Sequence, residues 1–116
     1  MAEKLNLFIG GSLVQSGTKS WIEVLNPATQ EVLCEAPCTT DEEIEMAIKA
    51  AKDAFLSWRE TPPPERSRVM MKYQDLLKTN QDEIAKILSK ENGKTFEDAK
   101  GDVWRGIEVV EQAANI

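Results

Sequence analysis

The sequence predicts an α+β chain, in which two N-terminal β-hairpins precede about four helices, and which forms the front part of a larger α/β protein. Three observations support this prediction. Residues 7–36 contain short β-forming segments separated by turn residues. From residue 40 onward, apolar residues recur every three or four positions, which is typical of helices. The last helical segment reaches Ile116 without glycine, proline or a basic last turn, so we expect a truncated helix.

Two hairpins account for the first region, residues 1–38. Residues 7–9 and 12–14 flank Gly10-Gly11, and glycine readily adopts the positive φ that a two-residue hairpin turn requires. Residues 21–25 and 31–36 form a second pair of β-forming segments on either side of an Asn-Pro turn. We therefore expect an antiparallel β-hairpin region.

The helical region, residues 39–116, begins at a capping box. The Thr40 hydroxyl can accept from the backbone of Glu43, whose carboxylate can reach back to the cap. Three prolines at 62–64 end the first helix, because proline lacks a backbone donor and restricts the residue before it. The second helix starts near residue 64 or 65 and runs to about residue 78. The predicted buried side chains of these two helices are Ile44, Ile48, Ala51, Phe55 and Trp58, then Val69, Tyr73, Leu76 and Leu77.

Further capping residues delimit the third and fourth helices. Asn80 and Glu83 can form a second capping box, and the third helix stops at Gly93, where glycine can adopt the left-handed conformation. The fourth helix opens at Thr95, with Asp98 three residues later. The predicted buried side chains are Ile84, Ile87 and Leu88, then Phe96, Val103, Ile107, Val110 and Ala114.

Composition argues against several classes of partner. The 20 acidic residues outnumber the 14 basic ones, and the basic residues form no stripe, which argues against nucleic acid. No apolar run approaches the ~20 residues that cross a bilayer, so we expect no membrane partner. With two cysteines and no sign of a targeting peptide, we expect a reducing, cytoplasmic location.

The residues supply no complete catalytic, cofactor-binding or metal site. Histidine is absent, which removes Ser-His and Cys-His pairs and the commonest metal ligand. Cys34 and Cys38 lack the second ligand pair of a structural zinc site and are predicted to be packing or loop cysteines. Gly10-Gly11 joins two strands, whereas a phosphate-binding loop opens a helix. The tryptophans at 21, 58 and 104 are predicted to pack in the core rather than to bind ligands.

Residues 101–106 form the segment with the strongest functional signal. Gly101 and Gly106 each cost the fourth helix about 1 kcal/mol relative to alanine, which suggests that another group approaches the backbone closely. Between them, Arg105 carries a planar fork of donors suited to a carboxylate or phosphate, and Trp104 could exclude water. The alternative is a surface arginine paired with Asp102 or Glu108.

Several motifs together resemble the opening segment of the NAD(P)-dependent aldehyde dehydrogenases. The motifs are Asn26-Pro27-Ala28-Thr29 before Glu31-Val32, Ala54-Phe55-Leu56-Ser57-Trp58, Arg66-Ser67-Arg68 and Glu91-Asn92-Gly93-Lys94-Thr95. Residues 101–111 are most similar to the coenzyme A-acylating, methylmalonate-semialdehyde branch. The resemblance covers about residues 7–116 and implies that the chain is an N-terminal part of that fold.

The resemblance implies an enzyme that oxidises a carboxylated semialdehyde with NAD and transfers the acyl group to coenzyme A. It also implies that Arg105 binds the substrate carboxylate, which favours the ligand role of Arg105 over the surface-pair alternative. Neither Cys34 nor Cys38 matches the catalytic cysteine of the family, so we expect this chain alone to be inactive and to bind no cofactor. The remainder of the dehydrogenase is the expected partner, in a homo-oligomer.

A non-catalytic α+β module that binds a protein partner through apolar helix faces is the alternative. A compact, cooperatively folding monomer would favour this module. A longer reading frame with a cysteine in a Rossmann-linked catalytic domain would favour the dehydrogenase.

Overall fold

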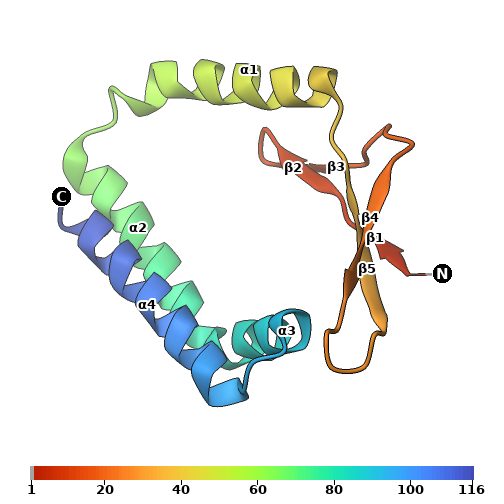
Figure 1. Ribbon diagram of the computed structural model, residues 1–116. Helices are drawn as coiled ribbons and strands as arrows, with labels where there is room; N and C mark the ends of the chain where they lie inside the picture. The colour runs from red at the N-terminus through yellow and green to blue at the C-terminus, as the bar shows by residue number, and fades with distance from the viewer. Residues whose placement is uncertain (1) are drawn as a thin grey trace. The chain divides into compact units, whose positions relative to one another are not determined.

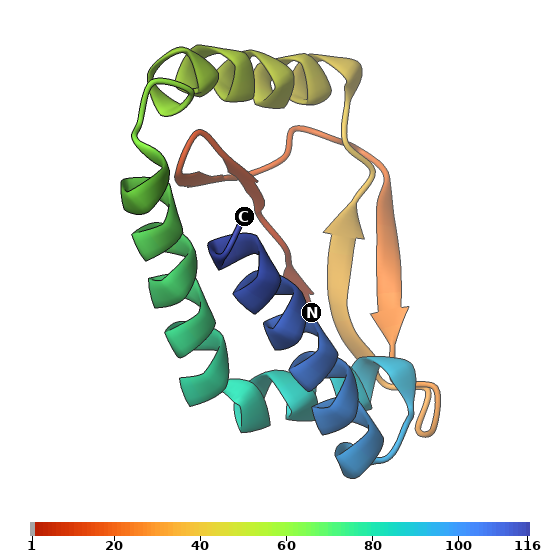
Figure 2. The same ribbon diagram turned by 90° about the vertical axis from the view of Figure 1, so that its left-hand side faces the viewer.

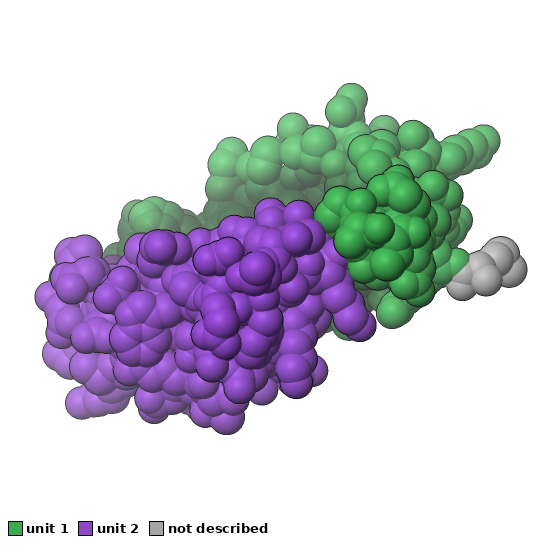
Figure 3. All heavy atoms as spheres, turned by 60° about the horizontal axis from the view of Figure 1, so that its bottom comes forward, with its two compact units in different colours: residues 1–60 green, residues 61–116 purple. Residues whose placement is uncertain are grey.

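The computed structural model describes residues 2–116. The chain divides into two compact units, residues 1–60 and residues 61–116, shown in separate colours in Figure 3. Within the described residues, the strands all precede four helices, so the predicted order of elements is confirmed. No helix in this part of the chain is long and apolar enough to cross a membrane.

The first predicted hairpin is confirmed as strands β2 (Leu7–Ile9) and β3 (Ser12–Val14). They pair antiparallel, with Leu7 opposite Val14 and Ile9 opposite Ser12. Gly10 and Gly11 form the turn with φ of 60° and 82°. Both angles lie in the region that glycine adopts without steric cost, which explains why two glycines stand at this turn.

The second hairpin is also confirmed, as strands β4 (Trp21–Leu25) and β5 (Val32–Pro37). Asn26 organises the connecting turn. Its side-chain oxygen accepts from the Ala28 N–H at 2.9 Å, and its carbonyl accepts from the Gln30 N–H at 2.8 Å. These bonds hold the Asn-Pro turn that the sequence predicts.

The expected purely antiparallel region needs a correction. Strand β1 (Glu3–Lys4) pairs with β5 in parallel, and the five strands form two separate sheets, β1-β5-β4 and β2-β3, as Figure 1 shows. A two-residue strand is too short to produce an alternating pattern, so no sequence signal marked it. The Lys4 ammonium lies 4.4 Å from the centre of the Trp21 ring, a contact between β1 and β4.

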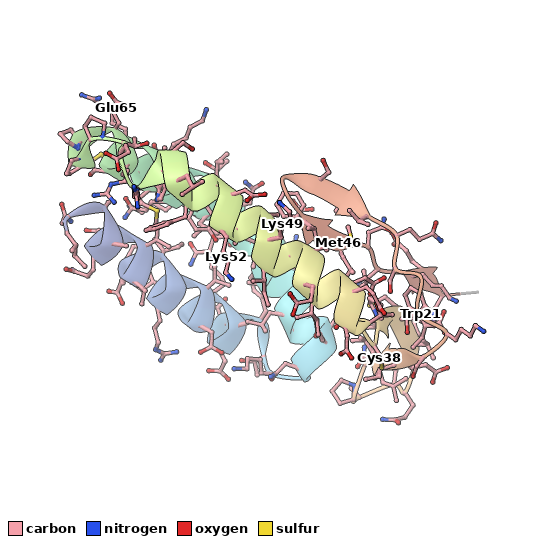
Figure 4. All side chains as sticks on the ribbon, turned by 90° about the horizontal axis from the view of Figure 1, so that it is seen from above. Trp21, Cys38, Met46, Lys49, Lys52 and Glu65 are labelled. Carbon is pink, nitrogen blue, oxygen red and sulfur yellow. The ribbon has the colours of Figure 1, made fainter. Side chains whose placement is uncertain are left out.

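Helix α1 (Asp41–Trp58) begins at the predicted capping box. The Thr40 side chain accepts from the Glu43 N–H at 3.3 Å, and the Glu43 carboxylate accepts from the Thr40 N–H at 2.9 Å. Figure 4 shows Lys49 and Lys52 on this helix, and Lys49 pairs with Asp53 at 2.6 Å. The predicted apolar stripe is not buried by residues 2–116, since α1 has no buried residue and Phe55 is 56% exposed.

The second unit consists of helices α2 (Pro63–Thr79), α3 (Gln81–Asn92) and α4 (Phe96–Ala114). Helices α2 and α4 lie side by side and run in opposite directions, as Figure 1 and Figure 2 show. Three side-chain hydrogen bonds join α4 to α2 and to the start of α3. From α2, Ser67 Oγ donates to the Ala114 carbonyl and Gln74 Nε2 donates to Glu111 at 2.6 Å. From α3, Gln81 Nε2 donates to the Lys100 carbonyl at 3.3 Å.

The core of this unit contains small side chains and one large one. Ala85 and Ala99 are completely buried, Ala114 is nearly so, and Ile107 is the one large fully buried side chain among residues 2–116. The predicted burial of Ile107 and Ala114 on α4 is therefore confirmed. Gly93 closes α3 with φ of 81°, as predicted.

Three predictions for α2 and α3 are wrong. Ile87 on α3, which was expected to be buried, is 58% exposed. Val69, Tyr73 and Leu76 are exposed, because α2 faces α4 with the side that carries Ser67 and Gln74. Asn80 forms no capping box, because it ends α2 as well as starting α3, and its side chain donates to the Leu76 carbonyl at 2.7 Å.

The predicted packing of the tryptophans holds in part. Trp21 is half-buried, and its indole N–H donates to the Thr18 carbonyl at 3.2 Å. Trp58 and Trp104 are 43% and 46% exposed, so residues 2–116 supply no core for either.

Candidate functional site

The candidate site lies on the first half of α4. Thr95 starts this helix, and its hydroxyl accepts from the Asp98 N–H at 3.2 Å, as predicted. The glycines at 101 and 106 do not break the helix, which continues to Ala114. The side chains of Asp102 and Arg105 are three residues apart on α4 and therefore lie on neighbouring turns of one face.

Arg105 forms the surface pair that the sequence offered as its alternative. Its Nη1 donates to Asp102 Oδ1 at 2.7 Å, and its side chain is 73% exposed. No other partner of this guanidinium is found within residues 2–116. Because arginine carries five N–H donors, most of its donors stay available to an anion.

Asp102 also binds a second cation. Its other oxygen, Oδ2, accepts from the ammonium of Lys94, which lies between α3 and α4. The hydrogen bond from Lys94 is the largest cause that lowers the pKa of Asp102, and Arg105 lowers it further. Asp102 is therefore ionised at neutral pH, and the three side chains together carry one net positive charge.

The two glycines of the segment have different surroundings. A Cβ at Gly101 would meet Arg105 Nη1 at 3.8 Å, which is ordinary van der Waals contact, and a Cβ at Gly106 would meet nothing within 4 Å. The close approach that the glycines suggested is therefore not made by residues 2–116. Trp104 is nearly half-exposed, so it does not shield Arg105 from water in this chain.

Sequence reasoning singled out Arg105 and considered Asp102, but it overlooked Lys94. The signal for Lys94 lay in its position, since it stands between Gly93, which ends α3, and Thr95, which starts α4. Because the backbone of Lys94 is fixed between two helix ends, its side chain points in a defined direction. It reaches Asp102, eight positions later.

The remaining candidate groups do not join this site. Cys34 lies half-buried on β5, and Cys38 is half-buried just after it, each with a free thiol. Among residues 2–116, no three His, Cys, Asp or Glu side chains are grouped so as to hold a metal ion. Gly10-Gly11 joins β2 to β3, and so does not stand before a helix as a phosphate-binding loop would.

Comparison with known proteins identifies the family. The model of the aldehyde dehydrogenase family matches residues 13–116. A mitochondrial protein of Dictyostelium discoideum assigned as an acylating methylmalonate-semialdehyde/malonate-semialdehyde dehydrogenase is 52% identical over 116 residues, which are 100% of this chain and 22% of that protein. The chain thus spans about a fifth of the length of this curated relative.

Solved structures give the same result. A Sinorhizobium meliloti protein assigned as a methylmalonate-semialdehyde dehydrogenase, complexed with NAD, superposes with a TM-score of 0.94 at 40% identity, over 98% of this chain and 23% of that one. Aldehyde dehydrogenase 21 of Physcomitrella patens, in complex with its reaction product succinate, superposes with a TM-score of 0.87 at 34% identity, over 99% and 24% of the two chains. The predicted fold class is confirmed, and the chain belongs to the aldehyde dehydrogenase family.

Proposed function

We propose that the chain is the N-terminal portion of a dehydrogenase that oxidises malonate or methylmalonate semialdehyde to an acyl-coenzyme A with NAD. The observation that carries this proposal is Arg105, an exposed arginine held by a single carboxylate in a chain that is 52% identical to a relative named for these semialdehydes. The similar structure from Sinorhizobium meliloti is complexed with NAD, which supports NAD as the oxidant.

Arg105 binds the carboxylate of the substrate. Both semialdehydes carry a carboxylate at the end opposite the aldehyde, and the planar guanidinium can hold such a group through two parallel hydrogen bonds. Asp102 engages Nη1 of Arg105 and leaves other donors for the substrate. The product of the similar Physcomitrella patens enzyme, succinate, also carries carboxylates, which supports this chemistry in the family.

Holding the carboxylate orients the aldehyde for the reaction. A substrate fixed at one end loses rotational freedom before the chemical step, which lowers the entropic part of the barrier. When NAD is bound, it would act as the hydride acceptor. We assign no residue of this chain to NAD or coenzyme A, because the one paired-glycine turn of residues 2–116 joins two strands. We also propose that the chain alone is inactive, because neither Cys34 nor Cys38 matches the catalytic cysteine of the family.

The β-hairpin region, residues 1–38, and the helical region, residues 39–116, together form this N-terminal portion. The remainder of the dehydrogenase is its partner, within a cytoplasmic homo-oligomer. The exposed apolar side chains of α1 and α2 support such a partner, since residues 2–116 leave several large ones more than 40% exposed, among them Ile44, Ile48, Phe55, Val69, Tyr73 and Leu76.

The test of the carboxylate role is Arg105→Leu in the full-length dehydrogenase that carries this chain. We expect kcat/KM for malonate semialdehyde to fall by about 10- to 100-fold, as for the loss of one charge-assisted pair, relative to the change for propanal. Arg68→Leu, at an exposed arginine on α2, is the matched control and should change neither substrate. An equal loss on both aldehydes would reject the role of Arg105.

The second test uses the 116-residue chain alone. It should show no NAD-dependent oxidation of either aldehyde, and measurable turnover would contradict the proposal. If the chain were a compact, cooperatively folding monomer that binds another protein, and its reading frame ended at residue 116, the non-catalytic module would replace the dehydrogenase as its function.

A further inference from the structure

Asp102 lies between two cations and divides its oxygens between them. Oδ1 accepts from Arg105 Nη1, and Oδ2 accepts from Lys94 Nζ. The two cations differ in exposure, because the Lys94 side chain is 29% exposed and the Arg105 side chain 73% exposed. Arg105 is therefore the more accessible of the two cations to a ligand.

Lys94, Asp102 and Arg105 form a charged cluster, in which the charge of Asp102 would repel a substrate carboxylate. An arginine paired with one carboxylate forms a neutral unit, and a substrate carboxylate that approaches it meets both the attraction of the guanidinium and the repulsion of the aspartate. A second cation on the same aspartate cancels that repulsion. With Lys94 in place, the cluster presents one net positive charge, located at Arg105.

The position of Lys94 suits this role. Its backbone is fixed between Gly93, in the left-handed conformation that ends α3, and Thr95, the N-cap of α4. The Ser89 hydroxyl donates to the Lys94 carbonyl at 2.7 Å, which further restrains the link between the helices. Because its backbone is already ordered, Lys94 loses less backbone freedom when it pairs with Asp102 than a lysine on a mobile loop would.

We propose that Lys94 is a specificity-determining residue that acts through Asp102: it neutralises this aspartate, so that Arg105 keeps its positive charge for the carboxylate of the substrate. The proposal rests on the proposed function of Arg105. Lys94 and Asp102 do not themselves touch the substrate, so both are positioning residues.

The experiment measures KM and kcat of the full-length dehydrogenase for malonate semialdehyde and for propanal. Lys94→Gln leaves Asp102 charged and uncompensated, so KM for the semialdehyde should rise about tenfold, the effect of one partly screened charge, while KM for propanal and both kcat values stay within about threefold. Lys94→Arg keeps the positive charge at position 94, so KM for the semialdehyde should equal that of the wild type. Lys90→Gln, at an exposed lysine on α3, is the control.

The double variant distinguishes a charge role from a structural one. Lys94→Gln with Asp102→Asn removes the repulsive charge together with its counter-ion, so KM for the semialdehyde should return to within about threefold of the wild type. If the contact of Lys94 with α4 were merely structural, it would still be missing in the double variant, and KM would stay raised. A KM that is no better in the double variant than in Lys94→Gln would overturn the proposal.

Three further outcomes are decisive. If Lys94→Gln does not fold, Asp102→Asn alone serves, because it removes the negative charge and leaves both cations, so KM for the semialdehyde should fall below the wild-type value. A KM that is unchanged or raised would reject the proposal. If Arg105→Leu selects against the semialdehyde while Lys94→Gln affects both aldehydes equally, the role of Lys94 fails and that of Arg105 stands. If Arg105→Leu itself affects both equally, the proposed function fails.

Discussion

The carboxylate of Glu43 accepts a hydrogen bond from the Ser16 hydroxyl at 2.9 Å, across 27 positions of the sequence. The same carboxylate accepts from the N–H groups of Gly17 at 2.8 Å and Thr40 at 2.9 Å. Ser16 is the one buried polar residue among residues 2–116. Glu43 therefore does more than cap α1, because it also ties the segment after β3 to the start of this helix.

Glu43→Gln should destabilise the first unit. The amide nitrogen of glutamine cannot accept, so at least one of the three donors from Ser16, Gly17 and Thr40 loses its partner. We expect a lower urea midpoint for Glu43→Gln, followed by circular dichroism. Glu45→Gln, at an exposed glutamate two positions after Glu43 on α1, is the matched control and should leave the midpoint unchanged. An equal effect of the two variants would contradict the role of Glu43.

The same network predicts how stability depends on pH. Hydrogen bonds from the backbone N–H groups of Thr40 and Gly17 hold the pKa of Glu43 below its ordinary value. A depressed pKa in the folded state means that the stabilisation is present above the unfolded pKa, roughly 4.3, and is lost as the pH falls through the folded value. Urea unfolding at pH 7 and at acid pH should show a loss that is smaller in Glu43→Gln than in the wild type.

Ile107→Ala should lower the stability of the second unit more than a substitution at any exposed position of α4. Ile107 is 1% exposed, so its truncation removes buried methyl groups and leaves a cavity, at a cost of about 2 to 5 kcal/mol. Val109→Ala is the matched control, because Val109 is 68% exposed and should change the free energy of unfolding by less than about 0.5 kcal/mol. Chemical denaturation of both variants checks the difference.

Gly106→Ala should have opposite effects in two settings. In the 116-residue chain a Cβ at this position meets no atom, so alanine should raise the free energy of unfolding by about 0.5 to 1 kcal/mol through helix propensity. We propose that in the full-length dehydrogenase another segment approaches this backbone, so that alanine should lower kcat/KM there. Unchanged turnover would show that Gly106 serves no close approach. Ala113→Gly, at an exposed alanine of the same helix, should destabilise the chain by a similar amount.

Arg105→Lys tests whether the planar fork matters as well as the charge. Lysine keeps the positive charge but cannot form two parallel hydrogen bonds with a carboxylate. We expect KM for malonate semialdehyde to lie between those of the wild type and Arg105→Leu, with propanal unaffected. A variant indistinguishable from the wild type would assign the effect to charge alone.

Local signals in the sequence predicted the elements well. The Gly10-Gly11 turn and the capping box of Thr40 and Glu43 depend on residues a few positions apart, so their chemistry can be read directly from the sequence. Strand β1 escaped prediction because two residues carry no pattern, and its pairing with β5 spans about thirty positions.

Signals that depend on tertiary packing were less reliable. The apolar pattern of α2 selected the side of Val69 and Tyr73, whereas the side facing α4 uses Ser67 and Gln74 to make polar contacts. At the candidate site, the unusual glycines around Arg105 drew attention to the right segment. The position of Lys94 between Gly93 and Thr95 was the one local signal for this residue, but it did not identify Asp102, eight positions later, as its partner.

Helix α1 has no buried side chain within residues 2–116, and this has a consequence for its dynamics. Most of the stability of a protein helix comes from packing, and α1 receives little of it from this chain. Its amide protons should therefore exchange with solvent sooner than those of α4, which packs against both α2 and α3. Protection in α1 would persist longest in the first turn, where the network of Glu43 holds the backbone.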